Sequence, residues 1–295
     1  MSGLDIKARL HALSSDRMSL SVDTAYGARV TELTDRVTGR QWLLTGPRAE
    51  DTSEEAVFRG DASRGWDECF PTILPCDDPV WGGRLRDHGM LWGRAWTVVD
   101  ASPQHLTTRF QGADIQFNRS LTVHGAELTV RYSLTSARVA KVPYLWSQHC
   151  VLHTTAADRI TLAGQGPMTA GGTGFEWPHH PARNLTSVGL TDEGFALKAY
   201  AQTPLFGMAQ VCGPHGGLRF DWNGAEVPSL GLWLDYGGWP AEAPLHQLAI
   251  EPATAGADDL AGAVASGQAR WLGPGETHSW SVRLTLLDPE DGKTV

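Results

Sequence analysis

Most of the chain consists of short runs in which apolar and polar residues alternate. In ELTVRYSLTS, residues 127–136, a Leu, Val or Tyr falls at every second position, with polar residues between them. Such alternation, with enrichment in Thr, Val and Tyr, is typical of β-strands that bury one face. Similar runs recur from residue 17 to residue 287, with Gly- or Pro-containing turns between them. The pattern predicts an all-β protein built of antiparallel strands.

One segment has a different pattern. Residues 257–267, ADDLAGAVASG, are rich in alanine, and Gly267 is placed to end a helix. No repeat, low-complexity tract or linker divides the chain. We therefore expect a single domain over residues 1–295, a large antiparallel β-sandwich or a closed variant of one, with a short helix near 257–267.

Residues 50–96 lack any sustained periodicity. The stretch EDTSEEAVFRGDASR, residues 50–64, is polar and acidic, and we expect a long surface loop there. Residues 65–96 combine Trp, Gly, Pro and charged residues. This composition favours a loop that faces a ligand over a core element.

Charge and composition exclude several classes of partner. Lys and Arg total 24 and Asp and Glu total 33, which gives a net charge of −9. This balance argues against nucleic acid or an anionic membrane as the main partner. There is no apolar run long enough to span a bilayer, and MSGLDIKARL has no apolar secretory segment, so we expect a cytoplasmic protein. The four cysteines form no CxxC pair, which favours reduced thiols over disulfides or zinc.

Two charged or polar positions interrupt otherwise apolar strands. Glu251 ends the run LAI and is followed by Pro252, which stops the strand pattern. Gln148 and His149 interrupt the apolar run VPYLWSQHCVL. A charge in such a setting is unfavourable unless it has partners or lies at an opening. The 12 tryptophans also supply candidate faces for stacking on sugar rings, although most of them must belong to the core.

Four segments, RGWDECFP, RDHGMLW, LWSQH and IEPATAG, follow one another along the chain. In this order they resemble the motifs of the aldose 1-epimerase (mutarotase) family and of its relatives that act on hexose 6-phosphates. AYGARVTELTDRVTGRQWL and WLGPGETHSWSVRLTLL are similar to that family's opening hairpin and closing strands, so the resemblance covers nearly the whole chain. It implies a galactose mutarotase-like β-sandwich.

The resemblance also implies roles for individual residues. Glu251 matches the catalytic base and His149 the catalytic acid, while His88 matches a histidine that contacts the sugar. Further substrate-binding positions follow from the matching segments or from their aromatic or carboxylate side chains: Arg64, Asp235, Trp66, Trp233 and Asp67. The chain departs from the galactose mutarotases at Gln148, where they have asparagine, and at Gly89-Met90, where they have two glycines. These differences indicate a divergent branch.

The chemistry that these residues would perform is simple. To interconvert the α and β anomers of a hexose, a base removes the proton of the anomeric hydroxyl and an acid protonates the ring oxygen, so that the ring opens and recloses. An ionised carboxylate and a protonated imidazole suffice, each contributing about 10²–10⁴-fold. The reaction requires no metal, nucleophile or redox cofactor.

Other functions remain open from the sequence. The chain could be a sugar-binding protein without turnover, or a glycoside hydrolase that uses Glu251 and Asp235, whose carboxyls would then lie about 5–5.5 Å or 6.5–9.5 Å apart. A metal site formed by His88, His149 and Glu251 is a weaker alternative. An anionic sugar is also a hypothesis, because guanidinium groups suit anions and arginines cluster near the expected groove. These are Arg64, Arg84, Arg86 and Arg94.

Overall fold

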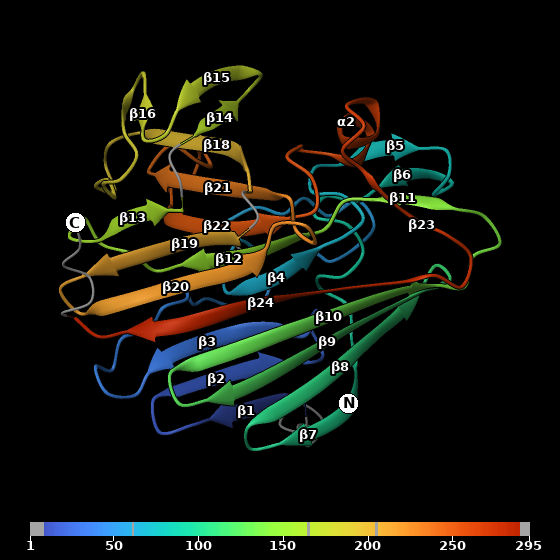
Figure 1. Ribbon diagram of the computed structural model, residues 1–295, viewed down its shortest axis with the longest axis horizontal. Coiled ribbons are helices and arrows are strands. Elements are labelled where there is room, and N and C mark those ends of the chain that lie inside the picture. The colour runs from blue at the N-terminus through green and yellow to red at the C-terminus, as the bar shows by residue number, and fades with distance from the viewer. Residues whose placement is uncertain (1–8, 61, 164–165, 204–205, 290–295) are drawn as a thin grey trace.

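Two large antiparallel β-sheets form the body of the protein, as the alternating pattern predicts (Figure 1). The computed structural model describes residues 9–60, 62–163, 166–203 and 206–289. The prediction of an all-β antiparallel sandwich is confirmed.

The first sheet has ten strands and carries the segments singled out in the sequence. Its spatial order is β1 (Leu10–Ser14), β2 (Met18–Asp23), β3 (Arg29–Asp35), β4 (Trp66–Cys69), β12 (Ser147–Leu152), β22 (His246–Ala253), β21 (Ser229–Tyr236), β18 (Phe195–Gln202), β14 (Pro167–Ala170) and β15 (Thr173–Glu176). Strands from all three thirds of the chain thus lie side by side at its centre, where β12 pairs with β4 and with β22.

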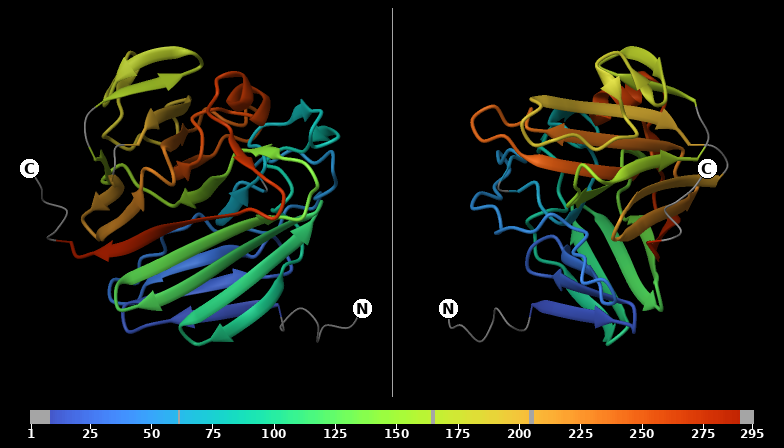
Figure 2. Two further views of the ribbon diagram at one scale, coloured as in Figure 1. Left: turned by 45° about the vertical axis from the view of Figure 1, so that its right-hand side comes forward. Right: turned by 90° about the vertical axis from the view of Figure 1, so that its left-hand side faces the viewer.

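The second sheet has eight strands. Their order is β13 (Arg159–Leu162), β19 (Phe206–Gly213), β20 (Gly216–Asn223), β24 (Thr277–Leu287), β10 (Glu127–Ser136), β9 (Ile115–His124), β8 (His105–Gly112) and β7 (Thr97–Ser102). The long green strands β8–β10 and the blue strands β1–β3 form separate layers in the turned views (Figure 2). Side chains at alternate positions of β9 and β10 are buried, so one face of this sheet packs into the core.

Three small strand pairs and one short helix complete the described structure. The pairs are β5 (Cys76–Asp78) with β6 (Gly83–Leu85), β11 (Val142–Tyr144) with β23 (Arg270–Leu272), and β16 (His179–His180) with β17 (Arg183–Asn184). The helix α2 (Leu260–Ala265) lies beside β5 (Figure 1). Asp259 caps its first turn by accepting a hydrogen bond from the Gly262 N–H, and Gly267 follows its end with a φ of 72°. The helix predicted at 257–267 is therefore present and shorter at both ends.

The prediction of an irregular segment at residues 65–96 is wrong at its start. Residues 66–69 form β4, a strand buried on both faces in the middle of the ten-stranded sheet. A strand of four residues that is covered on both sides has no period-two pattern, which is why its sequence resembles a loop. Residues 50–60 and 62–64 lie outside the sheets, but Phe58 and Ser63 are buried, so these parts of the predicted loop fold inward rather than only covering the surface.

A buried ion pair connects the two sheets. Arg119 of β9 donates from Nη1 to Oε1 of Glu68 on β4 at 3.0 Å, and both side chains have no exposed surface. Tyr132 and Trp146 also donate to the Glu68 carboxyl. Burial raises the pKa of Glu68 to about 7, although Arg119 and the hydrogen bonds act in the opposite direction. The pair joins the sheets behind the strand that carries Gln148 and His149.

None of the described helices is long and apolar enough to cross a membrane.

Candidate active site

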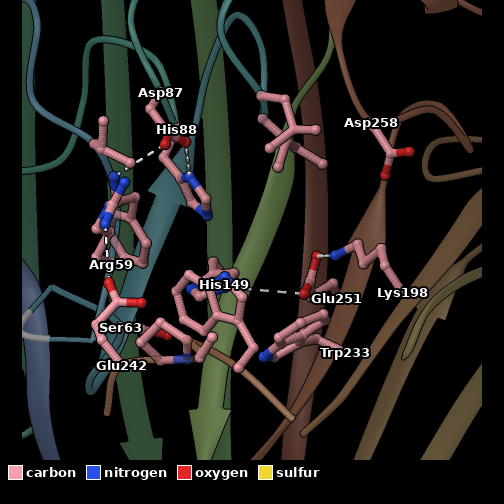
Figure 3. A pocket seen from close by; sticks show the side chains of 17 residues that line it. Arg59, Ser63, Asp87, His88, His149, Lys198, Trp233, Glu242, Glu251 and Asp258 are labelled. Carbon is pink, nitrogen blue, oxygen red and sulfur yellow. Dashed lines mark hydrogen bonds and ion pairs between the residues drawn. The ribbon is translucent and has the colours of Figure 1, made fainter. Parts of the chain in front are cut away.

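A pocket of about 550 Å³ opens on the ten-stranded sheet (Figure 3). Its floor comes from the central strands β12, β22, β21 and β18, and its walls come from loops near residues 57–59, 63, 73–74, 87–88, 239–242 and 258. A pocket of this size, with apolar walls and a few convergent polar groups, is typical of a small-molecule site. The charged or titratable side chains that line it are Arg59, Asp87, His88, His149, Lys198, Glu242, Glu251 and Asp258.

Strand register brings the two residues that the sequence singles out side by side. In the antiparallel pair β12–β22, Ser147 lies opposite Ala253 and Cys150 opposite Ile250, which places His149 opposite Glu251. Residues directly opposite on antiparallel strands project from the same face of a sheet. His149 Nε2 and Glu251 Oε1 are 3.9 Å apart. The pocket therefore has an imidazole and a carboxylate on its floor, next to each other.

The Glu251 carboxylate uses its two oxygens differently. It is fully buried, yet its Oε1 has no hydrogen-bond partner among the residues that the structure describes. Its Oε2 contacts the Lys198 ammonium and accepts a hydrogen bond from Ser147 at 3.4 Å. Gly231 lies opposite on β21, where a Cβ atom would be only 3.3 Å from Oε2. The glycine thus leaves room for the carboxylate, whose Oε1 lies beside His149 on the pocket floor.

The structure gives a neutral His149. Burial lowers its pKa well below the ordinary value of 6.5, and the neighbouring His88, Lys198 and Arg29 act in the same direction. The nearby Glu251 carboxylate would favour a protonated ring, but Lys198 already contacts that carboxylate. Nδ1 of His149 is buried and has no hydrogen-bond partner in the described part of the chain. The resemblance implies that His149 is a protonated acid, whereas its surroundings favour the neutral imidazole.

His88 comes to the same pocket from a tight turn. It has a φ of 57°, and Gly89 follows with a φ of 70° where any Cβ would meet the Phe70 carbonyl. Nδ1 of His88 is 2.7 Å from an oxygen of Asp87, so the carboxylate orients the ring. Phe58 stacks on His88 at 3.9 Å between ring centroids. The His88 and His149 rings meet edge to face at 4.9 Å.

Only one of the remaining residues predicted from the sequence lines the pocket. Trp233 lines the pocket. Asp67 lies opposite His149 on β4 and pairs with the buried Arg29, and Trp66 is fully buried in the core. Asp235 accepts hydrogen bonds from the backbone N–H groups of Gly238 and Trp239. Of the eight candidates, the pocket brings together Glu251, His149, His88 and Trp233, and its lining does not include Arg64, Asp235, Trp66 or Asp67.

Three of the four arginines that suggested an anionic sugar are engaged elsewhere, and the fourth, Arg64, does not line the pocket. Arg84 is exposed beside Asp77, Arg94 pairs with Glu54, and Arg86 donates to four backbone carbonyls. The arginine that lines the pocket is Arg59, which pairs with Glu242 at its mouth. The lining thus contains four carboxylates (Asp87, Glu242, Glu251 and Asp258) against two cations (Arg59 and Lys198).

Sequence reasoning missed Lys198 and Phe58. Lys198 interrupts the apolar run FALKAYAQ, a signal of the same kind as His149, but a lysine on an alternating strand usually faces solvent. Phe58 lies in a loop that the sequence presents as polar surface.

Neither the metal-site alternative nor the hydrolase alternative gains support. In the part of the chain that the structure describes, no three His, Cys, Asp or Glu side chains are grouped to hold a metal ion. Asp235 caps a turn instead of lining the pocket.

Comparisons with known proteins identify the fold. No protein-family model and no curated protein sequence matches the chain. Among solved structures, a candidate aldose 1-epimerase from Escherichia coli K12 superposes with a TM-score of 0.72 at 14% identity, covering 95% of this chain and 99% of that one. A galactose mutarotase-like protein from Lactobacillus casei gives 0.69 at 14% identity, with 94% and 99% covered. A galactose mutarotase related enzyme from Lactobacillus acidophilus gives 0.69 at 12%, with 97% and 100% covered.

These matches extend over nearly the full length of each chain. The protein therefore has the galactose mutarotase-like fold, as the resemblance implied. At 12–14% identity the similarity concerns the fold, and the activity has to be argued from the pocket.

Proposed function

We propose that this chain is an aldose 1-epimerase-type isomerase that interconverts the α and β anomers of a neutral sugar. The observation that carries the proposal is the free Oε1 of Glu251, buried on the pocket floor beside His149. A buried carboxylate oxygen without a partner is unfavourable, and a ligand hydroxyl would satisfy it. An anomeric hydroxyl donating to Oε1 is placed for proton removal.

The neighbouring groups would hold the sugar. His88, fixed by Asp87, presents its other ring nitrogen as a hydrogen-bonding group, and neutral His149 adds a second. Trp233 and the adjacent Trp239 line the pocket and offer apolar faces to a pyranose ring. The excess of carboxylates in the lining disfavours a phosphorylated or otherwise anionic sugar, because each added negative charge would meet like charge.

Exchange NMR between anomers tests this function directly. Wild type should accelerate the exchange of a neutral aldohexose, whereas Glu251→Gln should lose about 10²–10⁴-fold of the rate while it still binds sugar. Glu127→Gln, at an exposed position of β10, is the matched control and should retain full activity. A panel of hexoses, hexose 6-phosphates and uronic acids should show activity on the neutral sugars. Equal rates for wild type and Glu251→Gln would indicate a sugar-binding protein without turnover.

A further inference from the structure

The reaction proposed above needs a proton donor for the ring oxygen, and the pocket contains a group that the resemblance does not assign. Lys198 of β18 lines the pocket, and its ammonium contacts Oε2 of Glu251 (Figure 3). Its side chain retains 21% of its exposure, so it is reached from the pocket. An ammonium has three N–H donors, and Glu251 is the one hydrogen-bond acceptor for this nitrogen among the described residues.

We propose that Lys198 is the catalytic acid of the anomerisation, acting beside Glu251 as the base. This assignment rests on the proposed function and adds to it the residue that supplies the proton. The anomeric and ring oxygens of a pyranose are bonded to the same carbon. The Glu251 carboxylate is a proton acceptor, and the Lys198 ammonium, which contacts its Oε2, is a proton donor beside it. Such a pair is suited to contact both oxygens at once.

Glu251 and Lys198 together accept and donate every proton that the reaction moves. Glu251 takes the proton of the anomeric hydroxyl as its oxygen becomes a carbonyl. The bond between C1 and the ring oxygen breaks with its electron pair on the ring oxygen, which receives a proton from the Lys198 ammonium. After rotation about C1–C2, attack of the new hydroxyl on the other face of the carbonyl returns both protons. No further reactant is needed.

His149 is poorly suited to the same step. Its ring is neutral because of burial and the surrounding cations, and a neutral imidazole that gives up its only ring proton would become an anion. The departing ring oxygen is an alkoxide, which is basic enough to take a proton from an alkylammonium. His149 is thus placed to orient the sugar by hydrogen bonding, and Lys198 contributes to keeping it neutral.

Several titratable groups surround Lys198. Glu251 faces it from β22, Asp258 lies in the loop after that strand, and Tyr200 follows on β18 with its ring 5.4 Å from the ammonium. Tyr200 donates its hydroxyl hydrogen bond to Asp258. His149 of β12 and Cys69 of β4 interact with the same charge. Lys198 thus shares the pocket lining with two carboxylates, Glu251 and Asp258.

Three substitutions of Lys198 distinguish a role as proton donor from a role as a positive charge alone. Lys198→Arg retains the positive charge beside Glu251, but a guanidinium does not deprotonate in proteins, so this variant should lose about 10²–10⁴-fold in anomer-exchange rate. Lys198→Met should lose a similar amount. Lys198→Ala should regain activity with methylamine, which carries N–H protons, but not with tetramethylammonium, which has the charge alone.

Different results with the Lys198 variants indicate different roles for this residue. Binding of sugar, followed by tryptophan fluorescence, shows that each variant is folded and has a formed pocket. Full activity of Lys198→Arg, or equal rescue by both cations, would overturn the acid role and leave Lys198 as an electrostatic partner of Glu251. Full activity of Lys198→Met would exclude both roles. If wild type itself exchanges no anomers, the proposed function fails, and the assignment of Lys198 fails with it.

Discussion

Replacing Arg119 with methionine would leave the Glu68 carboxyl buried between the sheets without its cationic partner. Burial already raises the pKa of Glu68 from 4.5 to about 7 in the folded protein. A raised pKa means that the folded state binds this proton more tightly than the unfolded chain does. Protonation of Glu68 therefore stabilises wild type fully below about pH 4.5, and this contribution is lost as the pH rises to about 7.

Without Arg119 the pKa of Glu68 rises further, because the group that lowered it is gone. Wild type is half ionised at Glu68 near pH 7, so it loses only a few tenths of a kcal/mol between pH 7 and pH 9. A folded variant that keeps Glu68 protonated loses about 1.4 kcal/mol per pH unit, so the difference in unfolding free energy between wild type and Arg119→Met should widen by about 2 kcal/mol from pH 7 to pH 9. A fixed loss from the broken hydrogen bonds and packing adds to this difference at every pH.

Urea unfolding followed by tryptophan fluorescence at pH 7 and pH 9 measures this difference. Arg131→Met, at an exposed position of β10, is the matched control and should show no such pH dependence. A difference between wild type and Arg119→Met that is the same at both pH values would refute the reasoning, since it would mean that Glu68 remains ionised without its partner.

Two further changes test the geometry of the pocket. Gly231→Ala places a methyl group 3.3 Å from Oε2 of Glu251 and from the Tyr200 ring. It should lower the exchange rate more than it lowers unfolding free energy, and an unchanged rate would show that the carboxylate adjusts freely. Asp87→Asn removes the carboxylate that orients His88. We expect the apparent affinity for sugar, measured as KM, to weaken by roughly tenfold if about 1.4 kcal/mol of orientation is lost. An unchanged KM would remove His88 from the sugar site.

The sequence determined the parts of this protein that depend on local pattern. Period-two alternation specified the strands that bury one face, such as β9 and β10, and a small, alanine-rich segment ended by Gly267 specified the helix. Glu251 and His149 were recognisable because each interrupts an apolar strand, where a charged or polar side chain is unfavourable without a special reason. His88 was recognisable from the short segment DHG, whose glycine has the positive φ that the turn requires.

Only the tertiary structure determined which residues of different strands lie next to one another. Strand order placed β12 beside β22 and so set His149 next to Glu251, and a further strand, β18, brought Lys198 to the same carboxylate. The same order gave Asp67 an ion pair with Arg29, and the packing of the second sheet on the first gave Glu68 one with Arg119. An alternating pattern shows that a strand has two faces, but the neighbouring strands and the loops above them determine which face becomes a core, a surface or a pocket.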